Sequence, residues 1–174
     1  MGSQRRDYAE FYRESCDDCL RAVLVSVGNR DTAQDLVDEA FARAFASWRT
    51  VSRHPGRRGR VVRTALNANI SRWRRRRREV PVPDPGLMAD PAAADAAADR
   101  SVDPRIMAAL LRLPARQRQV VALRLFLDLD TARTAEVLGI APSTVKAHLA
   151  RALAALRDTI PTPQQEMPSC TTTT

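Results

Sequence analysis

The chain has 174 residues and a mass of 19.3 kDa, enough for one ordinary domain or two small ones. Lysine and arginine number 28 against 20 aspartate and glutamate residues, which gives a net charge of +8 and a pI near 10.8. The sequence contains no run of about 18 apolar residues and no apolar segment behind its N-terminus. This pattern favours neither a membrane span nor a signal peptide, so we expect a cytoplasmic protein without a membrane partner.

The charge is unevenly distributed along the chain. Residues 1–78 carry a net +9 and residues 104–160 a net +5, whereas the segment 79–103 between them carries −5. Basic blocks suit a polyanionic partner, because each arginine placed on a phosphate releases condensed counterions. A merely soluble basic protein would show the same charge, so charge alone does not separate the two interpretations.

Three helices are predicted in the first basic block. Residues 7–27 carry apolar side chains at helical spacing, and Gly28 follows them as a C-terminal stop. Asp31 is placed to cap a second helix, and a loop containing proline and glycine precedes a third helix over about 61–78. We therefore expect a small helical domain over 7–78.

Two segments have the composition of unfolded chain. Residues 79–103 combine proline, alanine and aspartate, and such a segment cannot bury enough apolar surface to fold alone. Residues 161–174 contain three prolines and end in four threonines. The sequence predicts a flexible linker over the first of these segments and a disordered tail over the second.

A second helical domain is predicted over 104–160. Asp103 can cap its first helix, and a short helix ending at Gly139 is followed by a last helix that begins at Pro142. A short helix, a glycine-containing turn and a second helix make a helix-turn-helix. The predicted fold class is therefore all-α, with two small helical domains joined by a flexible linker.

The last helix offers a face for DNA opposite its buried side. In helix-turn-helix proteins the second helix lies in the major groove, where its first two turns reach base edges and phosphates. Arg151 is the best candidate base reader, but two alanines on this face offer only apolar contact, so we hypothesise recognition largely through DNA shape and phosphates. A solvated amphipathic helix is the alternative interpretation. The candidate residues are Ser143, Thr144, Lys146, Ala147, His148, Ala150 and Arg151.

The third helix offers a different mixture of side chains. A run of arginines at its end is compatible with a plain solvated helix end. Amides that can bond exposed bases and an indole that can stack on them favour distorted or single-stranded DNA instead. The candidate residues are Arg63, Asn67, Asn69, Ser71, Arg72, Trp73 and Arg74.

No pattern in the sequence indicates catalysis, a cofactor or a metal site. Cys16 and Cys19 form a lone CxxC without a second pair, and their spacing suits an apolar helix face, with a thiol switch as the alternative. His54 and His148 lie in unrelated segments, and neither a glycine-rich phosphate loop nor a nucleophile triad is present. We therefore expect a protein that is not an enzyme.

Nearly all of 7–159 resembles an extracytoplasmic-function sigma factor, the smallest two-domain class of the sigma-70 family. DTAQDLVDEAFARAFASW (31–48) resembles region 2.1 to 2.2 of that family, and RVVRTALNANISRWRRRRR (60–78) resembles region 2.3 to 2.4. The third block, which resembles region 4, is LPARQRQVVALRLFLDLDTARTAEVLGIAPSTVKAHLARALAALR (113–157).

The resemblance implies a protein that directs core RNA polymerase to specific promoters and helps to open the DNA. It implies that Asp35, Asp38 and Glu39 dock on a coiled coil of the polymerase β′ subunit, with the β subunit as a further contact. It also implies that the segment from Asn67 to Arg74 captures a flipped base of the minus 10 element, while the last helix faces the minus 35 element. An anti-sigma factor is a partner that the resemblance leaves open.

The chain departs from the family pattern at several positions. Arg60 stands where many members have a tryptophan, Thr134 occupies an often aliphatic core site, and Ala147 and Ala150 replace larger or more polar readers. These departures affect the expected promoter sequence more than the expected function. The alternative function is a stand-alone helix-turn-helix regulator that binds an operator without polymerase.

Overall fold

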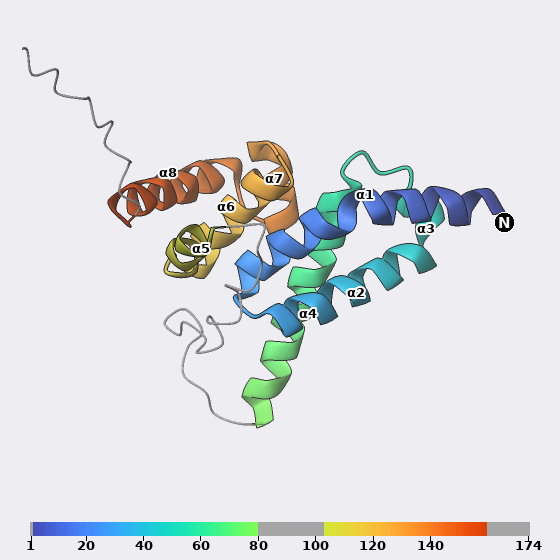
Figure 1. Ribbon diagram of the computed structural model, residues 1–174, viewed down its shortest axis with the longest axis horizontal. Helices are drawn as coiled ribbons and strands as arrows, with labels where there is room; N and C mark the ends of the chain where they lie inside the picture. The colour runs from blue at the N-terminus through green and yellow to red at the C-terminus, as the bar shows by residue number, and fades with distance from the viewer. Residues whose placement is uncertain (1, 80–102, 160–174) are drawn as a thin grey trace, which may run out of the picture.

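The structure is a computed structural model that describes residues 2–79 and 103–159 (Figure 1). These two ranges are helical apart from short turns, and neither contains a strand, so the predicted all-α class is confirmed. Apart from Glu79 and Asp103, the predicted linker and the predicted tail lie outside the described residues. No helix in the described ranges has the length and apolarity that a membrane crossing requires.

The first helical group consists of two long helices and a third that crosses them, with one short turn of helix between. Its elements are α1 (Gly2–Val27), α2 (Arg30–Ala46), α3 (Trp48–Val51) and α4 (Arg57–Glu79). Both α1 and α2 pack on α4, and a cluster of aromatic rings that includes Phe11, Phe41 and Trp48 joins α1 to α2.

Three local predictions for this group need correction. The second helix is capped by Asn29, whose side chain accepts a hydrogen bond from the Thr32 amide at 2.8 Å, and Asp31 lies in its first turn. The first helix begins at Gly2 and not at residue 7. Its first turn is polar and exposed, so it carries no apolar periodicity from which the sequence could indicate it. The helix α4 begins at Arg57 and not near residue 61, and Gly59 is a buried residue inside this helix instead of part of the preceding loop.

The second helical group contains the helix-turn-helix. Its elements are α5 (Pro104–Leu111), α6 (Ala115–Phe126), α7 (Thr131–Leu138) and α8 (Pro142–Thr159). The predicted cap Asp103 accepts from the Arg105 amide at 2.7 Å, and Gly139 ends α7 in the left-handed region at φ 65°. Glycine suits that position because it lacks the Cβ that makes left-handed backbone costly.

A single hydrophobic core runs through both groups. It includes Phe11, Leu24 and Leu36 from the first group and Leu110 and Leu123 from the second. The contact between α1 and α6 is the most extensive of all the contacts between helices in the described ranges, and Figure 1 shows α6 lying beside α1. The two predicted helical regions therefore pack directly on one another.

Five large apolar residues on the predicted helix stripes are not buried: Tyr12, Phe45, Ile106, Leu125 and Leu153. Phe45 of α2 is 49% exposed, and Leu153 of α8, expected to be buried, is 43% exposed. On α8 the inward positions are Val145 and Ala152, both fully buried. Where the apolar stripe of a helix is wider than the neighbouring helices can cover, the residues at its edge stay in solvent. A helical wheel does not show which residues these are.

Candidate nucleic-acid interface

The turn between α7 and α8 determines which side of α8 faces outward. Val120, Ala135 and Val145 form a small core inside the helix-turn-helix, and Thr134 is buried beside them with its hydroxyl 3.5 Å from the Leu129 carbonyl. Many family members have an aliphatic residue at position 134. The long hydrogen bond supplies the acceptor that the buried hydroxyl of Thr134 needs there. With Val145 inward, the opposite side forms the α8 face, made of Ser143, Thr144, Lys146, Ala147, His148, Ala150 and Arg151.

Most of the α8 face is open to solvent. Lys146 and Arg151 are exposed, and neither forms an ion pair within the described ranges. His148 and Thr144 are only half-buried, and the Nδ1 atom of His148 is buried without a hydrogen-bond partner in those ranges. The two long cations of this face are therefore available to phosphates, whereas the imidazole is partly withdrawn.

The candidate residues of α4 do not share one face. At 100° per residue, Arg63, Asn67, Ser71 and Arg74 follow one stripe, and all four are exposed. We call these four residues the α4 stripe. The other three candidates are partly buried and point elsewhere around the helix: Asn69, Arg72 and Trp73.

Arg72 is turned towards α2. Its guanidinium lies 3.0 Å from a carboxylate oxygen of Glu39 and 3.7 Å from one of Asp35. Arg43 binds the other carboxylate oxygen of Glu39 at 2.5 Å. The structure therefore joins a predicted DNA contact to two of the predicted polymerase contacts, a link that no local sequence pattern indicates.

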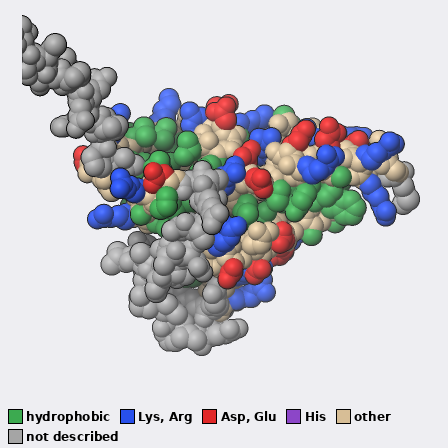
Figure 2. Space-filling model, viewed as in Figure 1, with side chains coloured by type: hydrophobic (Ala, Val, Ile, Leu, Met, Phe, Trp, Pro, Cys, Tyr) green, Lys and Arg blue, Asp and Glu red, His purple; other side chains and the backbone are tan. Residues whose placement is uncertain are grey.

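The acidic face of α2 consists of Asp35, Asp38 and Glu39. Asp35 and Asp38 are exposed, and Asp38 accepts a hydrogen bond from the side-chain amide of Gln34 at 3.0 Å. A groove of about 350 Å³ adjoins Asp38, and Figure 2 shows an apolar strip there between α1 and α2. Sequence reasoning missed this groove, because apolar spacing places Phe45 on the helix stripe without showing that its ring stays exposed. Its lining residues are Tyr8, Tyr12, Asp38, Phe41, Ala42 and Phe45.

The cysteine pair packs as the helical pattern indicates. Cys19 is fully buried, and burial raises the pKa of its thiol to about 12, which keeps the unreactive thiol form. Cys16 is half-buried, and the pKa of the neighbouring Tyr12 is raised to about 12, chiefly by a hydrogen bond with Cys16. Among the described residues no group of histidine, cysteine and carboxylate side chains could hold a metal ion.

A helix-turn-helix packed on a helical group with an arginine-rich helix defines a two-part DNA-binding protein. The family model "Sigma-70, region 4" matches residues 104–156. The chain is 34% identical over 154 residues to RNA polymerase sigma-E factor of Streptomyces coelicolor, covering 87% of this chain and 85% of that protein. It is 31% identical over 145 residues to RNA polymerase sigma factor SigV of Bacillus subtilis, covering 80% of this chain and 82% of that one.

A solved structure shares the fold. The sigma factor RpoE of Bartonella quintana, solved in complex with the anti-sigma factor NepR, superposes with a TM-score of 0.71 at 20% identity. The match covers 88% of this chain and 96% of that one. The chain belongs to the RNA polymerase sigma factors, in the extracytoplasmic-function group of the sigma-70 family.

Proposed function

We propose that this sigma factor directs core RNA polymerase to specific promoters and helps to open the DNA during initiation, without catalysing a reaction itself. The observation that carries the proposal is the combination of an exposed helix-turn-helix face with an exposed acidic helix on one chain of the sigma-factor family. A stand-alone operator-binding protein has no use for the acidic face.

We assign the two DNA surfaces to the two promoter elements. The α8 face meets the minus 35 element, where Lys146 and Arg151 bind phosphate or guanine. The α4 stripe meets the minus 10 element, where Asn67 can bond a base edge while Arg63 and Arg74 neutralise backbone phosphates. We assign residues 7–78 and 104–160 as the corresponding functional regions.

Two weak contacts on one chain reinforce one another when polymerase holds both. The second contact then forms at a high effective concentration, so neither surface alone needs high affinity. This arrangement suits an α8 face that contains two alanines and few polar readers. We expect the free protein to bind promoter DNA poorly and the polymerase complex to bind it well.

The acidic face of α2 supplies the proposed polymerase contact. Exposed carboxylates attract a basic surface of the β′ subunit, and the neighbouring groove can take an apolar side chain. We also include an anti-sigma factor among the proposed partners, beside the β and β′ subunits and promoter DNA, because the solved sigma factor that shares the fold is bound to one.

Neutralising this face tests the docking assignment. The triple variant Asp35→Asn, Asp38→Asn, Glu39→Gln should bind core polymerase about tenfold more weakly in a fluorescence titration, since each exposed charge contributes up to about 1 kcal/mol. Unchanged affinity would contradict the assignment. The control makes the same change in net charge at three exposed acids of α1: Asp7→Asn, Glu10→Gln and Asp17→Asn.

Run-off transcription tests the function as a whole. Core polymerase is incubated with and without the protein on a library of upstream fragments from its own genome. Transcripts that appear only with the protein would establish sigma activity and reveal both promoter elements. An absence of transcripts, together with operator binding that needs no polymerase, would favour the stand-alone regulator.

A further inference from the structure

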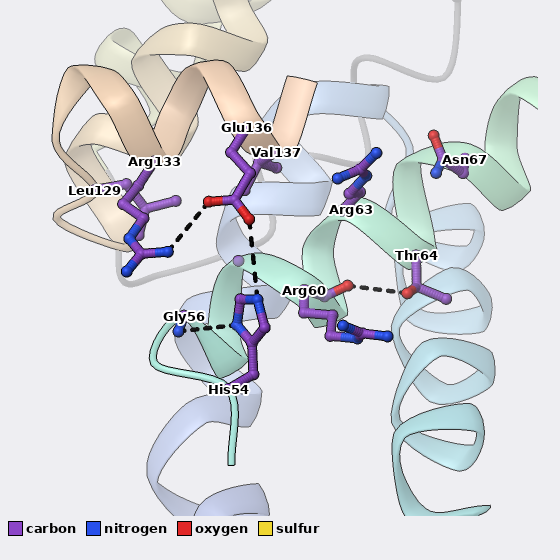
Figure 3. Close-up of a pocket in the computed structure, with 11 residues that line it drawn as sticks. His54, Gly56, Arg60, Arg63, Thr64, Asn67, Leu129, Arg133, Glu136 and Val137 are labelled. Atoms are coloured by element: carbon purple, nitrogen blue, oxygen red, sulfur yellow. Dashed lines mark hydrogen bonds and ion pairs between the residues drawn. The ribbon is translucent and has the colours of Figure 1, made fainter. Parts of the chain in front are cut away.

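A pocket of about 260 Å³ lies between α7 and the start of α4 (Figure 3). Gly59, Leu129 and Val137 line one side of it, where a Cβ atom added at Gly59 would lie 3.0 Å from the Val137 side chain and 3.5 Å from that of Leu129. The volume is below the range of about 300–1,000 Å³ for pockets that enclose drug-sized ligands. The pocket therefore has room for a compact ligand and not for a large one.

Arginine side chains lie at both ends of this pocket. Figure 3 shows Arg133 of α7 at one end and Arg60 and Arg63 of α4 at the other. Arg60 and Arg63 are three residues apart, so they lie on one side of α4, and neither forms an ion pair within the described ranges. A guanidinium can bind a phosphate through two parallel hydrogen bonds. Each end of the pocket can therefore take one phosphate group.

Arg133 keeps this capacity although it already has a partner. Its guanidinium lies 3.1 Å from a carboxylate oxygen of Glu136 on the same helix, and 41% of its side chain is exposed. An arginine carries five N–H donors in a planar fork. The contact with Glu136 therefore leaves donors of Arg133 for a phosphate.

The middle of the pocket combines a hydrogen-bond donor with an acceptor. The Nδ1 atom of His54 accepts a hydrogen bond from the Gly56 amide at 3.0 Å, so the neutral ring carries its proton on Nε2. That atom lies 3.9 Å from a carboxylate oxygen of Glu136, too far for a hydrogen bond between them (Figure 3). A ligand hydroxyl can accept from the imidazole and donate to the carboxylate, whereas Glu136 would repel a phosphate at this place.

We propose that this pocket binds a small polyol with a phosphate group at each end, such as a sugar bisphosphate. Its phosphates bind Arg133 at one end and Arg60 with Arg63 at the other. A hydroxyl between them bonds His54 and Glu136. The site goes beyond the proposed function and does not depend on it. Because Arg63 also belongs to the α4 stripe, a bound ligand would compete with DNA for this cation.

DNA is another source of phosphate groups for these arginines. Neighbouring phosphates of a DNA strand are joined by a deoxyribose without a free hydroxyl, so the strand brings no donor to Glu136. The carboxylate would then face phosphates without a compensating hydrogen bond. The middle of the pocket therefore favours the small polyol over a DNA strand.

Calorimetric titration of the full chain, without DNA or polymerase, tests the site. The probes are fructose 1,6-bisphosphate and fructose 6-phosphate at matched ionic strength, because a chain of net charge +8 attracts any anion. We expect the bisphosphate to bind about tenfold more tightly, since its second phosphate adds a charge-assisted contact. In Arg133→Gln this preference should fall to about threefold or less, while the affinity for the monophosphate stays within about twofold of wild type.

Arg157→Gln is the matched control. It removes the same charge from an exposed arginine in the last turn of α8, which does not line the pocket, and it should keep the full preference for the bisphosphate. If circular dichroism shows that Arg133→Gln does not fold, Arg63→Gln replaces it, because loss of a cation at the other end should also reduce the preference.

Four results would overturn the inference. Equal binding of the two probes would show that the pocket does not hold two phosphates, and an unchanged preference in Arg133→Gln would show that α7 does not contribute. An equal loss in Arg133→Gln and Arg157→Gln would indicate general attraction of anions. If Arg133→Gln weakens binding of a single-stranded DNA oligonucleotide as much as that of the bisphosphate, the pocket belongs to the DNA surface. Failure of the proposed function is separate, because wild-type protein would then yield no transcripts with core polymerase.

Discussion

The two candidate DNA surfaces differ in how the rest of the chain treats them. The α8 face projects into solvent with Lys146 and Arg151 unpaired in the described ranges. The α4 stripe runs beside α7 at its first end, and Arg72 on the same helix is held by carboxylates of α2. Solvent exposure alone therefore does not identify a DNA-binding surface. The side chains better able to bind bases lie on α4, which is more enclosed by other helices than α8 is.

The first way to sharpen this comparison is to ask whether the two groups unfold together. Leu123→Ala removes a fully buried side chain of α6 from the shared core, and we expect it to lower the free energy of unfolding by about 2–5 kcal/mol. A thermal melt followed by circular dichroism should show one transition at a lower temperature. Two separate transitions, with only one shifted, would contradict a shared core.

A smaller effect separates residues on and off the α4 stripe. Asn67→Ala removes a group that can bond a base edge, so discrimination at one minus 10 position should fall by about 1–3 kcal/mol. Asn69→Ala is the matched control, because it removes the same amide from a position outside the stripe. Permanganate footprinting of open complexes on promoters with and without a substitution at that position measures the discrimination of both variants. Equal losses in the two variants would show that the stripe is wrongly assigned.

On the α8 face we expect weaker and less specific effects. Lys146→Ala should reduce affinity for all sequences alike and lower the salt dependence of binding by about one counterion. Arg151→Ala should keep most minus 35 discrimination if shape and phosphates carry recognition. Promoter titrations with polymerase at several salt concentrations measure both quantities. Complete loss of discrimination in Arg151→Ala would refute recognition through shape.

The smallest expected effect concerns the link between α4 and α2. Arg72→Ala breaks the pairs with Glu39 and Asp35, which are partly exposed, so the free energy of unfolding should fall by about 1 kcal/mol or less. Denaturant titration of this variant beside Glu39→Gln, and of the double variant, gives the coupling. Strictly additive losses would mean that the pair contributes nothing.

Local signals in the sequence were sufficient for most helix boundaries. Asp103, Gly139 and Pro142 act through backbone groups a few residues away, and the structure confirms all three positions. At the start of α2 two polar residues compete for the cap, and Asn29 takes it because it stands outside the helix that Arg30 begins. Such competition between neighbouring residues is a limit of reading caps from sequence.

Contacts between distant segments could not be predicted in the same way. The pairing of Arg72 with Glu39 and the approach of Val137 to Gly59 depend on how helices cross, which apolar spacing does not specify. The spacing of apolar residues likewise did not show which residues at the edge of a stripe are exposed, and Phe45 and Leu153 are examples. The residues that make up each candidate surface were therefore predictable from the sequence, whereas the helices that pack against that surface were not.

Promoter binding by the separated components tests the central claim most directly. A labelled promoter duplex from the run-off experiment is titrated with the protein alone, with core polymerase alone and with both together. We predict a specific complex only with both, and its loss when either promoter element is scrambled. Binding by the protein alone with undiminished affinity and specificity would contradict the account, because the two DNA surfaces would then act without polymerase.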